Sequence, residues 1–499
     1  DPQQRAPRTG VRLKGRDHVA IAQRPHAVPE GSDAGQEHGR AAGQPGAVAG
    51  DPRRRAHPRK RVQDRRDVAQ TQVSDGDRRI VFRARLVQAN SSVTTVTSQN
   101  IGRGGALISD RERTAVQAAV EAPAPSWSYC ARCVLPDTRP GLSLDDEGVC
   151  SACRSHESRP RVDWAARAED WARLVERARG LGRDHDCVIP VSGGKDSTWQ
   201  VLTCLEWGLR PLCVTWRPPR RTALGRRNLD NLISLGVDHV DVSINPHVEA
   251  RFARAAFRER GDPGIPMHMA LFALPLDVAA RRGIPLVVWG ENSAVEYGGA
   301  DGVGRGHRLD EAWLERYGVT SGTTWRDWVG VEGLTARELS MYRGPSPSDL
   351  LDAGCEAVFL GHYFPWDPDE TARVAAEHGF RGSERARTGS NASADLDDEL
   401  IAVHHWLKWH KFGLTRTFDT LSLEIRNGRI TRAEAVAELG RRGVERPGAD
   451  IDAFCRFAGL SADEFEAIAD GFRDPAVWRR GPEGWRIDGF LIDRWDWTS

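Results

Sequence analysis

Residues 187–200 read CVIPVSGGKDSTWQ. A short apolar run ends at Ser192, and two glycines, Lys195, Asp196 and Ser197 follow it. Glycines let the backbone approach an anion closely, and a helix that begins after them offers free N–H groups and the positive end of its dipole. The spacing differs from G-x-x-x-x-G-K-[ST], the common phosphate loop. The stretch therefore predicts a strand, a phosphate-binding loop of another kind, and a helix.

The segments around this loop alternate between strand and helix patterns. Apolar runs predict strands at 186–191, 211–216, 238–244, 285–292 and 356–363, and helical patterns cover 163–180, 197–207 and 226–235. Strands that alternate with helices form a parallel sheet covered on both faces. Ligands of such sheets bind beyond the carboxyl ends of the strands. We therefore expect an α/β fold with a Rossmann-like parallel sheet.

The composition of the chain changes near residue 126. All 17 Trp, all five Tyr and all nine Cys follow it, and residues 1–120 carry 22 Lys/Arg against 12 Asp/Glu. Such a segment buries little apolar surface, so we expect residues 1–126 to be disordered or a spurious leader. The rest of the chain is acidic, which disfavours a nucleic-acid partner. No apolar stretch is long enough to span a membrane and no secretory leader is visible, so we expect a cytoplasmic protein.

Four cysteines stand as two pairs just before the phosphate loop. Cys130 and Cys133 form one C-x-x-C, and Cys150 and Cys153 form another. This spacing predicts a four-thiolate zinc site, which is structural because the protein supplies all four ligands. Two disulfides are the alternative, and the missing secretory signal argues against them. His156 could replace one thiolate, although we interpret it as a surface histidine.

Three units follow from these patterns. We expect a zinc-binding unit at 127–160, an ATP-binding domain at 161–394 and a mostly helical region at 395–499. In the last of these, TRAE (431–434) and SADE (461–464) resemble helix capping boxes. Four further cysteines are expected in or beside the core, namely Cys187, Cys204, Cys213 and Cys355. A role of these thiols in sulfur transfer is the alternative, but none forms a C-x-x-C pair with another.

The stretch SGGKDS closely resembles the pyrophosphate loop of the ATP pyrophosphatase (PP-loop) families. The resemblance implies that ATP is split between its α and β phosphates and that AMP passes to a substrate oxygen. A nitrogen or sulfur nucleophile then displaces that oxygen. The implied ATP contacts are Ser192, Gly193, Gly194, Lys195, Asp196 and Ser197, of which the last three are also expected to be catalytic. Asp196 could orient Lys195 or hold Mg²⁺ beside the phosphates.

Several blocks around this loop resemble the N-acetyl sugar amidotransferase family of surface-polysaccharide biosynthesis. They are YCARCVLPDTRPGLSLDDEGVCSAC (129–153), TWRPPRRTALGRRNLDNLISLGVDHVDVSINP (215–246), WGENSAVEYGG (289–299), FLGHYFPWD (359–367) and KFGLTRTFDTLSLEIRNGRITRAEA (411–435). The resemblance implies a sheet of the adenine nucleotide alpha hydrolase type and the cofactors ATP, Mg²⁺ and structural Zn²⁺.

The same resemblance implies a reaction and partners. The acetamido oxygen of a nucleotide- or lipid-linked N-acetyl sugar is adenylated, and ammonia replaces it to give an acetamidino sugar for lipopolysaccharide O-antigen. A separate glutaminase subunit and a cyclase-like barrel subunit are expected to supply the ammonia.

Candidate substrate residues follow the predicted strand ends. Glu291, Asn292, Glu296 and Tyr297 suit sugar, Mg²⁺ or ammonia contacts, although they also suit loop structure. Trp216, with Arg217 and Thr222, is placed to contact adenine or phosphate. Other candidates are His362, Tyr363 and Trp366, the possible anion-binding set Arg416, Glu424 and Arg426, and the histidines His404, His405 and His410, for which packing is the simpler interpretation than metal binding.

Two other functions compete with this interpretation. A tRNA-thiolating enzyme can also place a double C-x-x-C unit before a pyrophosphate loop, but it needs a tRNA-binding surface and reactive core cysteines. A zinc-ribbon adaptor that only senses ATP would not need the intact SGGKDS loop.

Overall fold

The computed structural model describes residues 127–298, 306–482 and 484–497, so the expectations for residues 1–126 lie outside the described residues. Its centre is a sheet of five parallel strands in the order β3-β2-β1-β4-β5. The strands are β1 Cys187–Pro190, β2 Pro211–Trp216, β3 Asp238–Val242, β4 Leu286–Trp289 and β5 Glu356–Phe359. The order reverses between β1 and β4, and a ligand site is expected beyond the strand ends at such a point. The predicted fold class is confirmed.

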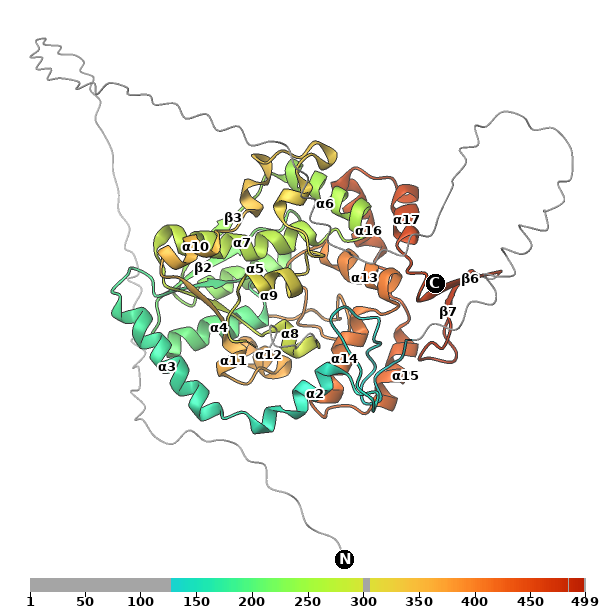
Figure 1. The fold of residues 1–499 in the computed structure, drawn as a ribbon, viewed down its shortest axis with the longest axis horizontal. Coiled ribbons are helices and arrows are strands. Elements are labelled where there is room, and N and C mark those ends of the chain that lie inside the picture. The colour runs from blue at the N-terminus through green and yellow to red at the C-terminus, as the bar shows by residue number, and fades with distance from the viewer. Residues whose placement is uncertain (1–126, 299–305, 483, 498–499) are drawn as a thin grey trace, which may run out of the picture. The chain divides into compact units, whose positions relative to one another are not determined.

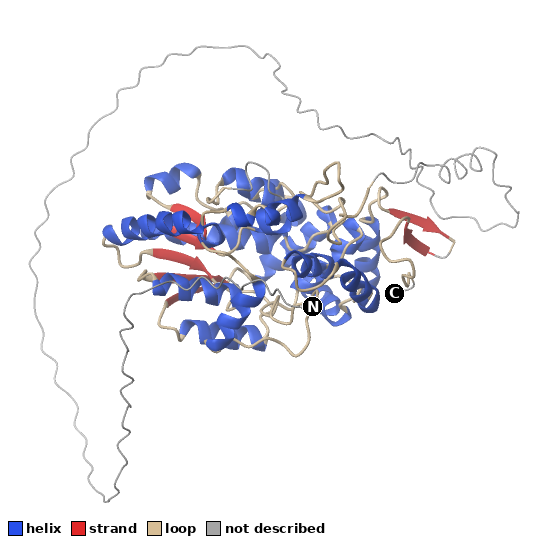
Figure 2. Cartoon of the chain, turned by 90° about the horizontal axis from the view of Figure 1, so that it is seen from below, coloured by secondary structure: helices blue, strands red, loops and turns tan. Residues whose placement is uncertain are grey.

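Burial explains why most of the strands are continuous apolar runs. All residues of β1, β2 and β4 are buried, because helices cover both faces of the sheet. At the edge, β3 is half-exposed and alternates apolar and polar residues. Figure 2 shows the strands between layers of helices.

The helices of this half pack on two faces of the sheet. One face carries α3 Trp164–Gly180, α4 Lys195–Glu206 and α5 Ala223–Ile233 in one hydrophobic cluster. The opposite face carries α7 Ile265–Arg282 and α9 Glu311–Tyr317. The other helical elements up to residue 377 are α2 Ser151–Glu157, η1 Arg159–Arg161, α6 Pro246–Arg260, α8 Ser293–Tyr297, η2 Trp325–Trp328, η3 Val331–Gly333, η4 Glu338–Tyr342, α10 Pro347–Asp352, α11 Leu360–Tyr363 and α12 Pro368–Glu377.

Some predicted boundaries are wrong. The strand expected at 356–363 ends at Phe359, and the next four residues form α11. A short apolar run fits a strand and a buried helical turn equally well, which explains this error. The helix expected from residue 197 begins at Lys195, so Lys195 and Asp196 belong to its first turn. The helix after Asp163 is confirmed, with the Asp163 carboxylate as its N-cap.

The predicted zinc-binding unit (127–160), which we call the zinc unit, shares one hydrophobic core with the C-terminal helices. Helices α13 Ile401–Phe412, α14 Arg416–Arg426, α15 Arg432–Arg442, α16 Gly448–Ala458 and α17 Ala462–Gly471 form this half, with the hairpin β6 Trp478–Gly481 and β7 Gly484–Ile487. Both predicted capping boxes are present, at the starts of α15 and α17. In Figure 1 the turns that precede α2 lie beside α14 and α15. Val134 and Leu135 of the zinc unit are buried in the same cluster as Phe418 and Leu439.

Candidate active site

The phosphate-binding loop connects β1, the central strand, to α4. Gly193 has a left-handed φ of +85°, and a Cβ atom there would lie 2.5 Å from the backbone nitrogen of Leu229. Position 193 therefore requires glycine, because the loop presses directly on α5. Gly194 is the N-cap of α4, and its carbonyl accepts from the Ser197 hydroxyl at 3.1 Å. The first N–H groups of a helix have no helical partners, so this turn can bind phosphate oxygens.

Lys195 and Asp196 form an ion pair in the first turn of α4. The Nζ atom of Lys195 lies 2.7 and 2.8 Å from the two carboxylate oxygens of Asp196. Trp366 donates from Nε1 to the same carboxylate at 3.0 Å, and the Thr371 hydroxyl donates at 2.9 Å. Lys195 is buried, so the position of its ammonium group is set by Asp196 rather than by solvent.

The loop faces a cavity of about 230 Å³. Its lining comes from the loop, α5, the turn after β4, the start of α12, the segment 391–397 and one face of α14. The lining residues are Ser192, Gly193, Gly194, Lys195, Asp196, Ser197, Gly225, Asn228, Glu291, Tyr297, Trp366, Pro368, Asn391, Ser393, Ala394, Asp395, Leu396, Asp397, Arg416, Thr420, Leu423 and Glu424. We call residues 192–197 and Glu291 the loop wall, and residues 391–397 with the cavity face of α14 the C-terminal wall.

Of the four residues predicted after β4, two reach this cavity. Glu291 lines it, and burial together with the negative charge of Asp196 raises the pKa of Glu291 to about 7. Tyr297 lines it as well, and burial raises the pKa of its phenol. The guanidinium groups of Arg139 and Arg416 lie 5.7 and 5.5 Å from the centre of the Tyr297 ring, within the range of a cation–π contact.

The other two residues stabilise the turn. Asn292 is the N-cap of α8 and accepts from Trp313 Nε1 at 3.2 Å, so its side chain is used for structure. Glu296 is buried and forms an ion pair with Arg159, while its carbonyl accepts from Arg426 at 2.9 Å. Neither lines the cavity, so the substrate role predicted for them receives no support from the geometry.

Trp216 also lies outside this cavity. Its Nε1 donates to Glu249 at 2.8 Å, and its side chain lines a separate small cavity near α6 and α13. The position of the indole therefore does not favour the predicted contact with the nucleotide. Arg217 is ion-paired with Asp241, and Thr222 is the N-cap of α5. These two neighbours thus hold the strand end and the helix start.

The remaining candidates divide between the cavity and the core. Trp366, Arg416 and Glu424 line the cavity. His362 and Tyr363 belong to α11 outside the cavity lining, and the Tyr363 ring packs 5.2 Å from the ring of Trp171.

The three histidines of α13 are buried among carboxylates. His404 lies 2.8 Å from Asp262, and His405 lies 3.3 Å from Asp395. His410 is buried near Asp470, at 3.8 Å. Within the described ranges, the four-cysteine set is the group of three or more His, Cys, Asp or Glu side chains that could hold a metal, and none of these histidines belongs to it.

The sequence did not reveal the part that segment 391–397 plays in the cavity. Asp397 packs against Gly225, where a Cβ atom would lie 2.4 Å from its Cα. The Asp397 carbonyl accepts from the backbone nitrogen of Thr222 at 3.0 Å. The run SADLDD (393–398) contains three acidic residues. This cluster of acidic residues in a predicted loop is the sequence signal that could have indicated a part of the site.

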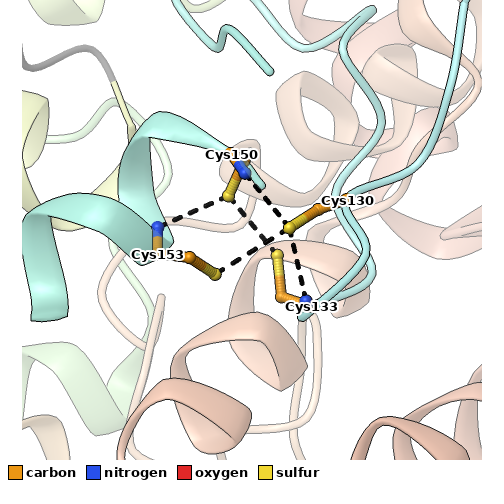
Figure 3. A group of neighbouring side chains, drawn as sticks. All are labelled: Cys130, Cys133, Cys150 and Cys153. Atoms are coloured by element: carbon orange, nitrogen blue, oxygen red, sulfur yellow. Dashed lines mark hydrogen bonds between the residues drawn. The ribbon is translucent and has the colours of Figure 1, made fainter. Parts of the chain in front are cut away.

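The four cysteines predicted to bind zinc converge, as Figure 3 shows. Their sulfur atoms all lie within 4.8 Å of one another and all four residues are buried. The Cys133–Cys150 and Cys130–Cys153 sulfur pairs are 3.6 and 4.0 Å apart. Four sulfurs at about 2.3 Å from a tetrahedral zinc ion would be about 3.8 Å apart, so the donor set fits Zn²⁺. A disulfide needs about 2.05 Å between sulfurs, and all four cysteines are free in this structure.

Backbone N–H groups support the thiolates. Cys130 Sγ accepts from the nitrogens of Arg132, Cys133 and Cys150 at 3.4, 3.4 and 3.2 Å, and Cys150 Sγ accepts from Cys153 at 3.4 Å. Such bonds favour the ionised sulfur that a metal requires. His156, the alternative ligand, lies instead 3.3 Å from the Asn427 side chain.

The unit that contains the four cysteines contacts the helices α13, α14 and α15 through Phe412, Asp419 and Arg432. Arg139 donates to Asp419 at 2.8 Å, Arg432 donates to the Cys133 carbonyl at 3.0 Å, and Thr138 donates to the Phe412 carbonyl at 2.7 Å. The four-cysteine cluster is therefore connected to the helix that carries the C-terminal wall.

Three of the other cysteines are buried in the core, as predicted. Cys187, Cys204 and Cys213 are fully buried among the apolar side chains that pack on the α4 face of the sheet. Cys355 is only partly buried. None of the four lines the cavity.

Comparison with protein families matches residues 381–489 to a family described as LPS biosynthesis protein WbpG-like, C-terminal domain. The match agrees, over these residues, with the family predicted from the sequence. We call the matched residues the WbpG-like domain, because they are similar to that family. They contain both segment 391–397 and α14, and therefore the whole C-terminal wall.

Other comparisons add little. No curated protein matches the chain. Structural comparison aligns it with an NH3-dependent NAD synthetase from Campylobacter jejuni (14% identity, 44% of this chain and 97% of that chain, TM-score 0.24) and an NAD+ synthetase from Burkholderia pseudomallei (17%, 46% and 91%, 0.22). A predicted subunit of tRNA methyltransferase from Methanocaldococcus jannaschii also aligns (14%, 46% and 90%, 0.22). Likeness at these scores supports no statement about activity.

None of the described helices is both long and apolar enough to cross a membrane.

Proposed function

We propose that this protein is an ATP-dependent amidotransferase that converts the acetamido group of an N-acetyl sugar into an acetamidino group, with release of AMP and pyrophosphate. One observation carries the proposal: the SGGKDS loop and the WbpG-like domain line the same cavity. A phosphate loop at a strand end supports ATP binding, and the domain match supports a sugar of lipopolysaccharide biosynthesis as the second substrate.

The chemistry follows from the weakness of an amide as an electrophile. The acetamido oxygen attacks the α phosphorus of ATP, the bond from that phosphorus to the bridging oxygen breaks, and pyrophosphate takes the electron pair. Ammonia then adds to the activated carbon, and AMP leaves with the sugar's former oxygen. The loop wall suits the first step, because Lys195 and the first turn of α4 can stabilise negative charge on the departing pyrophosphate.

We infer that two carboxylates of the loop wall hold Mg²⁺. Asp196 and Glu291 both line the cavity, and the charge of Asp196 contributes to the raised pKa of Glu291. A divalent cation binds well between two carboxylates beside a phosphate site, because it neutralises their mutual repulsion. When bound, the ion would neutralise phosphate charge, while Lys195, Trp366 and Thr371 orient the Asp196 carboxylate.

The C-terminal wall suits a sugar carried on a nucleotide or a lipid diphosphate. Arg416 lines the cavity, and its Nε atom is buried with no hydrogen-bond partner among the described residues. Its nearest carboxylates, Asp395 and Asp419, are each 3.8 Å away. This guanidinium can therefore bind an anionic oxygen. Asn391, Ser393 and Thr420 on the same wall can bind sugar hydroxyl groups.

The source of ammonia is proposed to be a separate protein. We infer a glutaminase subunit that works with a cyclase-like barrel subunit, and we place the reaction in the cytoplasm, where ATP is available. A test is to add glutamine instead of ammonium to the purified protein. We expect no amidation until such a glutaminase is added.

The core cysteines weigh against tRNA thiolation. A sulfur carrier must reach the activated substrate, whereas Cys187, Cys204 and Cys213 are fully buried outside the cavity lining. Burial also raises the pKa of the Cys213 thiol, which keeps it in the unreactive form.

The proposal is tested by incubating the full chain with ATP, Mg²⁺ and ammonium, with and without a panel of N-acetyl sugar nucleotides. We expect AMP and pyrophosphate in equal amounts only when an acceptor sugar is present, and an amidine product by mass spectrometry. Transfer RNA with a sulfur donor serves as the competing substrate. AMP release only with tRNA would contradict the proposal.

A further inference from the structure

The proposed reaction must release one proton. The acetamido nitrogen carries one hydrogen and ammonia carries three, whereas the acetamidinium product holds three on its two nitrogens. One proton must therefore leave when ammonia has added and before AMP departs. A side chain that accepts it must reach the cavity, must not be held by a cation, and must be ionised near neutral pH.

Most carboxylates of the cavity are already engaged. Asp196 is paired with Lys195, and Glu424 lies 3.4 Å from Arg429. Asp395 accepts from Thr388 and is paired with His405. Glu291 is the partner of Asp196 in the proposed Mg²⁺ site. These four carboxylates are therefore poor candidates for the base.

Asp397 is the remaining carboxylate of the cavity. It is only half-buried, it lines the cavity, and it forms no ion pair with any described residue. We propose that Asp397 is the general base that removes the proton from the attacking nitrogen. This inference rests on the proposed function and adds a catalytic residue to it.

The fold holds Asp397 at a fixed distance from the phosphate loop. Gly193 of the loop presses on Leu229, and Asp397 presses on Gly225, so both contact α5 one turn apart. Four residues of helix rise about 6 Å, so the two contact points on α5 are about 6 Å apart along the helix axis. The backbone bond from Thr222 to the Asp397 carbonyl, at 3.0 Å, fixes the segment further.

The surroundings keep the carboxylate weakly basic. Burial raises the pKa of Asp397 to about 6, and the charge of Asp395 adds to this rise. Arg221 and Arg387 act in the opposite direction. Asp398, the next residue, faces the separate cavity with Glu249, and its own pKa is raised by burial to about 7. A base with a pKa near 6 is ionised at neutral pH and still accepts a proton effectively.

The test compares Asp397→Asn with the wild type in single-turnover reactions that follow pyrophosphate and AMP separately. We expect pyrophosphate to appear at nearly the wild-type rate, because adenylation does not need this base. AMP formation should slow by about 10²- to 10⁴-fold. The matched control is Glu399→Gln, which changes an acid two residues away that is paired with Arg220 at the surface. This control should keep both rates.

The pH profile gives a second readout. A base must be ionised, so wild-type AMP formation, measured at a constant concentration of free ammonia, should rise with pH through about 6 and then level off. This limb should be missing in Asp397→Asn, and Asp397→Glu should restore part of the rate. A wild-type rate that stays flat through this pH would overturn the proposal even if the Asn variant failed to fold.

The outcomes separate the two proposals. If the wild type forms no AMP with any N-acetyl sugar, the proposed function fails. If the wild type is active and Asp397→Asn keeps its AMP rate within about twofold, the role of Asp397 is wrong. An equal loss of both products with a raised KM for ATP would instead make Asp397 a nucleotide-binding residue and would also overturn the inference.

Discussion

The two walls of the cavity are built in opposite ways. The loop wall comes mainly from six successive residues, 192–197, and its geometry is local: a strand end, two glycines and a helix start. The C-terminal wall combines a loop and a helix that are held by distant partners, including the zinc unit about 280 residues earlier in the chain, where Arg139 donates to Asp419.

This difference indicates which wall can determine ATP binding and which can determine the choice of acceptor. A local loop can bind the phosphates of ATP in many enzymes, because its ligands are backbone groups and the helix start. A wall assembled from distant segments can be shaped for one acceptor. We therefore assign activation to the loop wall and the choice of acceptor to the C-terminal wall.

Breaking the zinc site should have the largest effect, and it should act on the C-terminal wall. We expect Cys133→Ser to lose about one zinc ion per chain and to lower the free energy of unfolding by more than about 4 kcal/mol. Elemental analysis measures the zinc content, and chemical denaturation measures the free energy of unfolding. Cys455→Ser is the matched control, since Cys455 is buried in the same cluster but outside the four-sulfur group. Unchanged metal content in Cys133→Ser would refute the zinc assignment.

Breaking the loop wall should abolish chemistry and leave the fold. In Lys195→Ala we expect pyrophosphate release to fall by about 10³-fold, because a charge that stabilises the leaving group is removed. Circular dichroism should stay unchanged. Arg373→Ala removes an exposed charge from the helix α12 that packs on α4 and should keep full activity. Full turnover in Lys195→Ala would show that the loop has another role.

Both walls contact α5, and the contact with the C-terminal wall can be disturbed at Gly225. A Cβ atom there would lie 2.4 Å from the Cα of Asp397, so Gly225→Ala must displace segment 391–397 from α5. We expect a loss of about 1–3 kcal/mol in stability and slower AMP formation. Gly180→Ala, where a Cβ atom meets nothing within 4 Å, serves as the control in thermal unfolding. Equal melting temperatures for the two variants would mean that the walls are not coupled through α5.

The smallest effect concerns Glu249, outside both walls. Burial raises the pKa of this carboxyl to about 8, so the folded protein holds the proton more tightly than the unfolded chain. Its stabilising contribution is complete below the unfolded pKa and is lost as pH rises towards 8. Glu249→Gln should therefore melt at a higher temperature than the wild type at about pH 8, with the difference disappearing near pH 4. A difference that does not depend on pH would contradict this.

The sequence predicted the parts whose chemistry is local. The phosphate loop, the four cysteines and the order of strands and helices could be inferred, because each depends on neighbouring residues. The pattern could not show that Asn292 and Glu296 stabilise a turn while Glu291 and Tyr297 reach the cavity, since all four follow the same strand. It also could not place Trp216, whose indole turns towards Glu249, or bring Asp397 against Gly225, because tertiary contacts decide both.

The most direct measurement follows the acetamido oxygen itself. An N-acetyl sugar nucleotide labelled with a heavy oxygen isotope in the acetamido group is turned over with ATP and ammonium, and the products are weighed by mass spectrometry. The two-wall account predicts that AMP carries the heavy oxygen and that the amidine product carries none. Unlabelled AMP would mean that this oxygen never attacks the α phosphorus, and it would contradict the account.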